Sequence, residues 1–589
     1  MFSKRKHDRP YTFQDSYITG QLSRPKGNVA VQYRPVMSGR ERAMLAAIIT
    51  ASAVVGFAFL TWLAGNGHSG LGTTGITQVL SWTGFMLILI IELIRLVQGA
   101  TLWLFATRAK DPVPILPAFG QRVAVLTTIV PGKEPLDVMT RTLTAMKKIA
   151  YPGTVDVWIL DEGDNDEVKA IAAKLGVRHF SRKGKPQYNQ TTGAFKAKTK
   201  AGNHNAWRAE HEHEYDFVAQ MDTDHVPHAN FLMRTIGYFR DPDVAFVVAP
   251  QVYGNLHESM LTKATAAQSY IFTGVVQRGG NGLDAPLLIG TNHVYRVSTW
   301  NQIGGYQDSI IEDHLTSITV HGTDNPLTGN RWKGVYTPDI LAIGEGPTSW
   351  TDYFNQQKRW AYGIWDIILN HSSRMLRPLS FGQKVAYAGL QFFYPSLAIM
   401  FLFGNVVTAL YLALGVSSMS VDTQVWAMLW GASMATHLGL FLWLRRFNLV
   451  KHERRDLSFD AMGLSLLTLP VYTAAAISAV LRRPLGYAVT AKGALAAKDS
   501  LVTYRLHLLW LVALLALTAD SLVNGTAGGN QFMWMLFTLA FTALPVAKHM
   551  LNRAQGIEVN ALGTLASVDR TLNSSLSLSG ARNLILRTR

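Results

Sequence analysis

The sequence predicts an α/β domain inserted between α-helical transmembrane segments. Apolar residues make up 48% of the 589-residue chain and gather in two blocks, residues 42–106 and 386–550. The region between them has an ordinary soluble composition, in which short apolar runs alternate with helical stretches. That alternation is the pattern of a parallel α/β sheet. The chain length also predicts more than one structural unit.

The net charge of +16 fits a membrane protein, because the basic residues flank apolar runs. Nucleic-acid binding is disfavoured, since no basic stripe with interleaved aromatic residues runs through the soluble region. The chain contains no cysteine, so the fold needs no disulfide and no oxidising compartment.

The first apolar block, residues 41–106, predicts two transmembrane helices, Ala43–Ala64 and Val79–Ala106. Residues 1–40 have a basic start with no apolar core behind it, which predicts a cytosolic tail rather than a cleavable signal peptide. Glu92 and Arg95 lie three residues apart in the second helix and can pair on one face. Such a pair is either structural or lines a channel.

The second block contains five apolar segments: Phe392–Leu414, Gln424–Leu444, Ala461–Leu481, Leu506–Val523 and Phe532–Met550. The loops 445–456 and 482–498 are both strongly basic and belong on the cytoplasmic side. The segment between these loops therefore cannot cross, and we expect it to lie in the membrane plane or to re-enter. This leaves six spans, in residues 41–106, 392–445 and 503–550. Both termini, including the tail 551–589, and the middle region are then cytoplasmic.

The middle region, residues 115–375, predicts the α/β domain. Helical stretches at Leu136–Ile149 and Asp166–Leu175 separate apolar runs of strand type. These runs are residues 122–129, 155–160, 216–224 and 244–252. Two of them end in acidic clusters, and ligands of parallel sheets bind beyond the carboxyl ends of the strands. We expect a nucleotide and a metal at that edge.

Asp222 and Asp224 follow one of these strands two residues apart, so their side chains can point to one side. Paired carboxylates suit Mg²⁺ or Mn²⁺ held together with substrate phosphates, although a solvated turn has the same pattern. Lys200 precedes a Gly-Asn turn, where a lysine can neutralise a diphosphate or remain a plain surface residue.

Glu312 and Asp313 are adjacent acids. In a closed site near other carboxylates the pKa of an acid rises, which suits a general base. The alternative is a pair of acids at a helix N-terminus, favoured by the helix dipole. Several histidines also raise the question of zinc, which is disfavoured because no cysteine supports a structural site. They are His204, His211, His213, His225 and His228.

The acidic and basic motifs form an ordered set: D-E-G at 161–163, K-A-G-N at 200–203, D-x-D-H at 222–225, E-D at 312–313 and Q-Q-K-R-W at 356–360. Over about residues 115–500 this set resembles the processive, membrane-embedded family 2 glycosyltransferases, such as cellulose, curdlan and hyaluronan synthases. The stretch "YAVTAKG" at 487–493 is similar to the gating loop of cellulose synthases.

The resemblance implies a GT-A (Rossmann-like) cytosolic catalytic domain with a UDP-sugar donor and a divalent metal, Mg²⁺ or Mn²⁺. It implies that Asp161 lies near the uridine and Lys200 near the diphosphate. Asp222 and Asp224 then serve the nucleotide and its metal, and Asp313, beside Glu312, is the base.

Further roles follow from the same resemblance for the Q-x-x-R-W motif, formed by Gln356, Arg359 and Trp360. Arg359 meets the pyrophosphate, and Trp360 lies where the acceptor sugar enters the channel. Thr490 and Lys492 belong to the gating loop that closes over the UDP-sugar, within a cytosolic and interface segment at 446–502. An interface helix at residues 376–391 precedes the second membrane block.

The implied function is polymerisation of glucose from UDP-glucose into a β-glucan, with translocation of the polymer through the helix bundle. The predicted partners are UDP-glucose, the growing polymer and the lipid bilayer of the bacterial inner membrane, with room for accessory secretion subunits. The alternatives are a chitin- or hyaluronan-type synthase that uses UDP-GlcNAc, and a non-catalytic membrane scaffold.

The match to cellulose synthases has departures. Ile311 stands where they have a threonine before the E-D pair, and "LLIGTN" at 287–292 replaces their acceptor motif. Two spans are expected before the catalytic domain instead of four, and the tail after Met550 is too short for a cyclic-dinucleotide-binding barrel. A β-1,3 linkage, as in curdlan, therefore stays open beside the β-1,4 linkage of cellulose.

Overall fold

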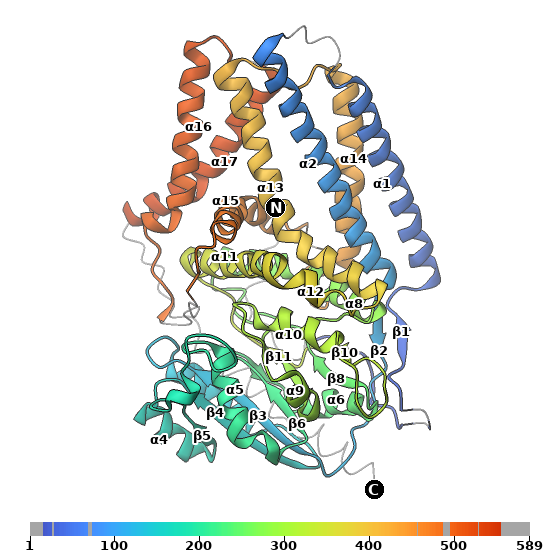
Figure 1. The fold of residues 1–589 in the computed structure, drawn as a ribbon, viewed down its shortest axis with the longest axis vertical. Helices are drawn as coiled ribbons and strands as arrows, with labels where there is room; N and C mark the ends of the chain where they lie inside the picture. Colours follow the sequence, from blue (N-terminus) through green and yellow to red (C-terminus); the bar gives the residue numbers. More distant parts are fainter. Residues whose placement is uncertain are drawn as a thin grey trace.

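The computed structural model describes residues 16–554, except 26, 28, 69–73, 456, 487–494 and 528. The described chain forms two tiers, an α/β domain and a set of long helices that stand on it (Figure 1). Two further helices, α11 (Trp350–Ile367) and α15 (Phe459–Val480), lie between the tiers.

The α/β domain is built on a seven-stranded sheet with the order β10-β8-β9-β6-β3-β4-β5. Its strands are β3 (Arg122–Ile129), β4 (Thr154–Asp161), β5 (Arg178–Phe180), β6 (Phe217–Gln220), β8 (Val244–Val248), β9 (His293–Arg296) and β10 (Lys333–Tyr336). The four strands expected from the sequence are β3, β4, β6 and β8, and all four are confirmed.

The expectation of a purely parallel sheet is wrong at one strand. β9 pairs antiparallel with both of its neighbours, β6 and β8, whereas the other pairs are parallel. The chain reaches β9 from a turn at Gly290, which lies at the same edge of the sheet as Asp222 after β6. A strand that enters from the carboxyl edge of its neighbours must run opposite to them, so the sheet is mixed.

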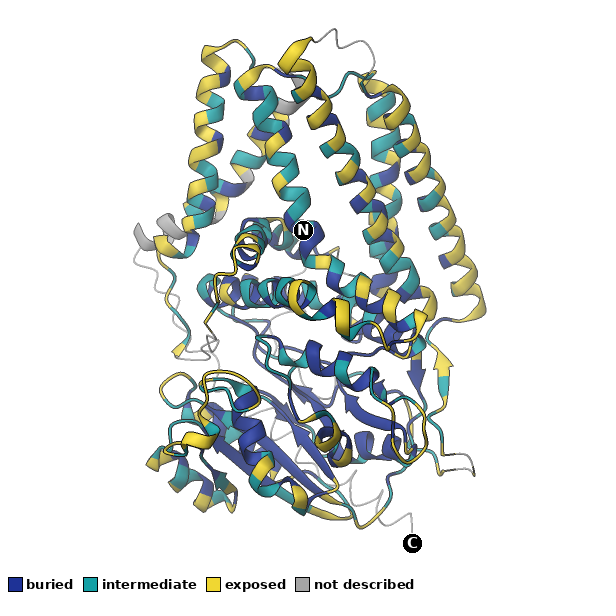
Figure 2. Ribbon diagram, viewed as in Figure 1, coloured by how far each residue is buried: buried dark blue, intermediate teal, exposed yellow. Residues whose placement is uncertain are grey.

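The core has two layers, one on each face of the sheet. Val123 and Val125 of β3 pack in one cluster with α3 (Leu136–Met146), and Ala124 and Leu126 pack in the other with Trp207. This alternation is the two-residue period of a strand whose two faces are both covered. The helices that cover them include α4 (Asp166–Leu175), α5 (Lys200–His211), α9 (Val297–Ile303) and α10 (Glu312–His321). Figure 2 shows the strands of this sheet mostly buried, with exposed residues at the start of β3, β4 and β5.

All seven apolar segments expected in the two membrane blocks are helical. They are α1 (Gly39–Asn66), α2 (Gly75–Arg108), α13 (Phe381–Leu414), α14 (Thr423–Leu444), α15, α16 (Arg505–Val523) and α17 (Gly529–Ala554). Among the described residues, six helices are long and apolar enough to cross a membrane: α1, α2, α13, α14, α15 and α16. α15 differs from the others in Figure 1, because it runs across their direction, in line with the expected in-plane segment.

A separate interface helix at 376–391 is not found. α13 begins at Phe381 with a capping box formed by Ser380 and Gln383, and it continues without a break to Leu414. Pro395 lies inside this helix, where a proline removes one backbone hydrogen bond and bends the axis instead of ending it. Figure 1 shows α13 changing direction partway along.

Glu92 and Arg95 form the expected ion pair on α2. Arg95 Nε donates to Glu92 Oε2 at 2.8 Å, and Arg95 Nη1 donates to Ser433 Oγ of α14 at 2.9 Å. The guanidinium group therefore joins two helices as well as neutralising the acid. This contact supports the structural interpretation of the pair.

The first turn of α11 is fastened to the chain that follows residues 487–494. Asp352 Oδ2 accepts a hydrogen bond from the Ala497 N–H at 2.9 Å. Asp499 in turn accepts from the backbone N–H groups of Trp350 and Thr351 at 3.1 and 2.9 Å. α15 also packs along α11, where Tyr472 donates to Gln357 Oε1 at 2.7 Å.

Candidate active site

Asp161 closes β4 and is fully buried. Its Oδ1 accepts from the Gly163 N–H at 2.8 Å, and its Oδ2 accepts from the Asn165 N–H at 2.6 Å. His179 Nε2 lies 3.2 Å from the same Oδ2. The carboxylate therefore holds the turn between β4 and α4.

The D-x-D motif follows β6 and forms a compact set of metal-type ligands. The ligand atoms of Asp222, Asp224 and His225 all lie within 4.8 Å of one another. His225 Nδ1 lies 3.3 Å from Asp224 Oδ1, and both residues are buried. Two carboxylates and an imidazole fit a divalent cation such as Mn²⁺. Of the five histidines considered for zinc, His225 belongs to this set.

Lys200 connects this set with the neighbouring loop. The residue opens α5, and its ammonium group contacts the carboxylate of Asp222 and donates to Gly290 O at 2.5 Å. Gln220, at the end of β6, lines the same cavity as Lys200 and Gly290. One cation thus lies between the end of β6 and the turn before β9.

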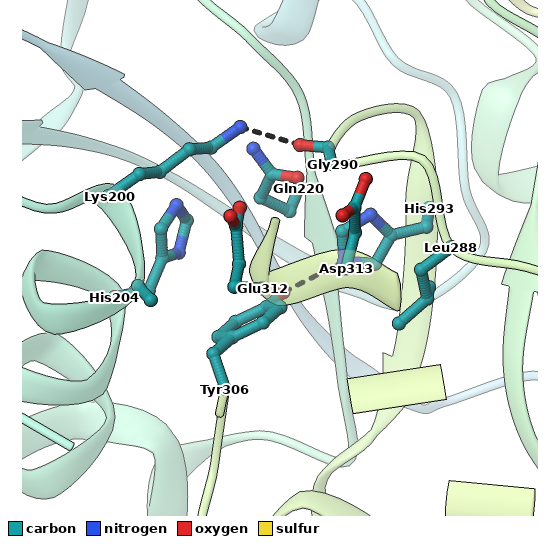
Figure 3. Close-up of a pocket in the computed structure, with 10 residues that line it drawn as sticks. Lys200, His204, Gln220, Leu288, Gly290, His293, Tyr306, Glu312 and Asp313 are labelled. Atoms are coloured by element: carbon teal, nitrogen blue, oxygen red, sulfur yellow. Dashed lines mark hydrogen bonds between the residues drawn. The ribbon is translucent and has the colours of Figure 1, made fainter. Parts of the chain in front are cut away.

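Glu312 and Asp313 occupy the first turn of α10 and line a cavity with Lys200 and Gly290 (Figure 3). Burial, and then the adjacent charge of Glu312, raise the pKa of Asp313 to about 7. Burial also raises the pKa of Glu312, against the opposing charges of Lys200 and Arg359. Gly290 has a φ of 75°, a backbone conformation that favours glycine, and a Cβ there would lie in van der Waals contact, 3.4 Å from Asp313 Oδ2.

The Q-x-x-R-W motif lies on α11, above the sheet domain (Figure 1). Gln356 is buried, and Trp360 packs partly buried against a cluster that contains Ile311 and Ile364. Arg359 lies close enough to Glu312 to favour its ionised form. Among the remaining predicted site residues, Thr490 and Lys492 lie outside the described residues.

Glu134 is a further acid that sequence reasoning missed. It follows β3, and its carboxylate accepts from the Val130 N–H at 2.8 Å and from Thr223 Oγ1 at 3.2 Å. Burial, and then the charges of Asp224 and Asp222, raise its pKa to about 7. The expectation that ligands bind beyond the carboxyl ends of the strands would have indicated Glu134, if it had been applied to the residues that follow the apolar run 122–129.

Comparisons with known proteins point to a glycosyltransferase family. The family model for glycosyl transferase family group 2 matches residues 217–546. The chain is 28% identical over 295 residues to a cellulose synthase catalytic subunit [UDP-forming] of Xanthomonas axonopodis pv. citri (strain 306). That match covers 48% of this chain and 38% of the other protein's length.

A probable glucomannan 4-beta-mannosyltransferase 14 of Arabidopsis thaliana is 23% identical over 372 residues, or 61% of this chain and 67% of that protein. Among solved structures, the mannosyltransferase PcManGT of Pyrobaculum calidifontis, in complex with GDP-Man and Mn²⁺, is 13% identical with a TM-score of 0.44. It covers 69% of this chain and 100% of its own.

The family match spans more than half of the chain and includes the D-x-D motif after β6, the E-D pair on α10 and the Q-x-x-R-W motif on α11. The mixed sheet and its flanking apolar helices confirm the expected fold class, a GT-A domain combined with helices of transmembrane type. The chain therefore belongs to glycosyl transferase family group 2.

Proposed function

We propose that the protein is a processive, inverting hexosyltransferase that polymerises glucose from UDP-glucose into a β-glucan. The observation that carries the proposal is the juxtaposition, in one cavity, of a partly buried Asp313 with a pKa of about 7 and the Lys200 ammonium group. The similarity to a cellulose synthase catalytic subunit [UDP-forming] supports the donor and the product class.

In the proposed reaction, Asp313 accepts the proton of an acceptor hydroxyl, and that oxygen attacks the anomeric carbon of the α-linked donor from the opposite side. A base with a pKa near neutrality is half ionised at working pH and suits this role. A single displacement breaks the bond to UDP and gives a β linkage.

The leaving diphosphate needs positive charge around it. Lys200 and Arg359 supply fixed cations, and Asp222, Asp224 and His225 would hold a divalent ion, Mg²⁺ or Mn²⁺, that adds Lewis-acid stabilisation. Asp161 is proposed to lie by the uridine, with Thr490 and Lys492 over the bound donor. Trp360, beside Arg359, offers a ring face for the acceptor sugar, with Gln356 one turn earlier on α11.

The polymer is proposed to leave through the helical tier. α11 lies between the sheet domain and the long helices, so the reaction centre and the bundle are neighbours (Figure 1). The basic loops 445–456 and 482–498 favour a cytoplasmic catalytic domain in a bacterial inner membrane. Accessory secretion subunits would act beyond the membrane.

The test is polymer formation from radiolabelled UDP-glucose with Mg²⁺ or Mn²⁺ by the purified, detergent-solubilised protein. Digestion with glucanases specific for β-1,4 or β-1,3 bonds then assigns the linkage. Asp313→Asn should lose polymer formation by a factor of roughly 10²–10⁴ while still binding UDP. Polymer from UDP-GlcNAc or GDP-mannose, with none from UDP-glucose, would replace the glucan assignment. Binding of donors without transfer from any of them would favour the non-catalytic scaffold.

A further inference from the structure

The cavity in Figure 3 has a wall that the proposed chemistry does not use. This wall adjoins the E-D pair and is formed by His204 of α5, His293 of β9 and Tyr306 of the loop before α10. All three side chains are buried, and His204 and His293 are each 1% exposed. The enclosed part of the cavity has a volume of about 10 Å³, the space of one water-sized group.

This wall is held rigidly in place. Asn205, next to His204, donates to Tyr306 O at 2.9 Å and accepts from the Tyr306 N–H at 3.0 Å. The Tyr306 hydroxyl is hydrogen-bonded to His293 Nε2 at 2.8 Å. The side-chain amide of Asn205 thereby joins α5 to the loop that precedes α10. These two hydrogen bonds to the Tyr306 backbone fix the position of Tyr306 relative to His204.

His204 is the residue of this wall whose ring nitrogens make no hydrogen bond. Neither of its ring nitrogens has a hydrogen-bond partner, although both are buried. Burial, and then the charge of Lys200, hold the pKa of His204 well below its usual range, so the ring is neutral. A neutral imidazole offers one N–H donor and one acceptor nitrogen, and leaving both unpaired in a buried site costs free energy.

We propose that His204 is a specificity-determining residue of the donor-sugar subsite, where it binds one hydroxyl of the hexose that is transferred. The inference rests on the proposed function. A hydroxyl can accept from the ring N–H or donate to the bare ring nitrogen, so it suits either tautomer of a neutral imidazole, and it fits the space of one water-sized group, which an acetamide does not. A carboxylate would meet the acids Glu312 and Asp313 in the same cavity and is disfavoured.

The test compares UDP-glucose with UDP-deoxyglucoses that each lack one hydroxyl, in the wild type and in His204→Leu. Single-turnover UDP release is the readout, and UDP binding is measured alongside. The wild type should use one of the deoxy donors on the order of tenfold less well than UDP-glucose, the loss expected for one hydrogen bond. His204→Leu should lose that discrimination and keep its affinity for UDP.

His321→Leu is the matched control, because His321 is a fully buried histidine at the other end of α10, bonded to the Tyr387 hydroxyl at 2.7 Å. It should leave the discrimination between donors unchanged. If His204→Leu does not fold, His204→Gln, which keeps one donor and one acceptor, should fold and retain the discrimination. The inference is overturned if His204→Leu discriminates between the donors as the wild type does. It is also overturned if a His204 variant slows UDP release from all donors by the same factor, since that result indicates a purely structural role.

Failure of the proposed function gives a different result, namely a wild-type protein that releases no UDP from UDP-glucose. In that case the experiment is repeated with the donor that the wild type does use and with its deoxy analogues. His204→Leu should again lose the discrimination between them.

Discussion

Asp313 shares the first turn of α10 with Glu312, and the charge of Glu312 adds to burial in raising the pKa of Asp313 to about 7. Arg359 on α11 and Lys200 on α5 act in the opposite direction on Glu312. Three charged neighbours, from three helices, therefore influence the ionisation of the proposed base, Arg359 through Glu312.

The first prediction concerns pH. Because the base acts in its ionised form, kcat/KM for donor consumption should rise with pH and level off above about 7, where Asp313 is ionised. Glu312→Gln removes the neighbouring negative charge, which lowers the pKa of Asp313 and moves the inflection to lower pH. A profile of UDP release against pH measures both, and an inflection that does not move in Glu312→Gln would contradict the coupling.

The second prediction concerns metal binding and needs no turnover. Asp224→Asn removes a charged ligand from the set formed with Asp222 and His225, and should weaken Mn²⁺ binding by roughly 10- to 100-fold. Titration of the UDP-bound protein, followed by the magnetic resonance signal of free Mn²⁺, measures it. His213→Gln, at an exposed histidine outside the set, should bind Mn²⁺ like the wild type. Equal affinity in all three proteins would exclude the set as a metal site.

The third prediction concerns two adjacent glycines. A Cβ at Gly305 would lie 1.9 Å from Arg208 Nη1 and 2.3 Å from Asn205 Oδ1, whereas one at Gly304 meets no atom within 4 Å. Both residues have positive φ, of 94° and 77°. Gly304→Ala should therefore cost about 1–2 kcal/mol from backbone strain. Gly305→Ala should cost roughly 2–4 kcal/mol, because it adds overpacking.

Thermal unfolding of the detergent-solubilised variants, followed by tryptophan fluorescence, ranks the two. The reverse order, with Gly304→Ala the less stable, would show that the contacts around Asn205 do not constrain this turn.

The fourth prediction concerns the buried ion pair of Arg278 and Asp111, which joins α8 (Gln277–Gly282) to β2 (Lys110–Pro112). Arg278 Nε and Nη2 each donate to Asp111 at 2.7 Å, and both side chains are buried. Arg278→Met leaves the acid buried and unpaired, and should destabilise the protein by about 3–5 kcal/mol. Lys169→Met, which breaks an exposed pair with Asp164, should leave the melting temperature unchanged. Equal melting temperatures for the two variants would refute the expectation.

The parts of the fold that hydropathy specifies were predictable. Apolar runs gave the long helices and four strands of the sheet, because burial and backbone period leave a direct pattern in the sequence. β9 was missed because its four residues, His293–Arg296, begin and end with charged or polar types. The helix expected at 376–391 differs from the structure, because α13 begins at Phe381 and continues past Pro395 to Leu414.

The candidate site was predictable where acids follow strands. Lys200, Asp222 and the E-D pair lie close together, as their positions at the sheet edge and the resemblance indicated. His204 and His293 were not placed, because nothing in their spacing indicates that α5 and β9 face one cavity. Glu134 was missed because it lies several residues beyond the end of β3 and not directly at the strand end. The roles of all these residues stay predictions until the experiments above are made.

The fastening of α11 has a mechanical consequence. In its first turn, Asp352 accepts a hydrogen bond from the backbone of Ala497, and Thr351 donates one to Asp499. Tyr472 of α15 donates a further hydrogen bond to the side of the helix. The same helix presents Arg359 to Glu312 on the sheet side. A displacement of α15 or of residues 497–499 would therefore move Arg359 relative to the acids of α10 without passing through the sheet.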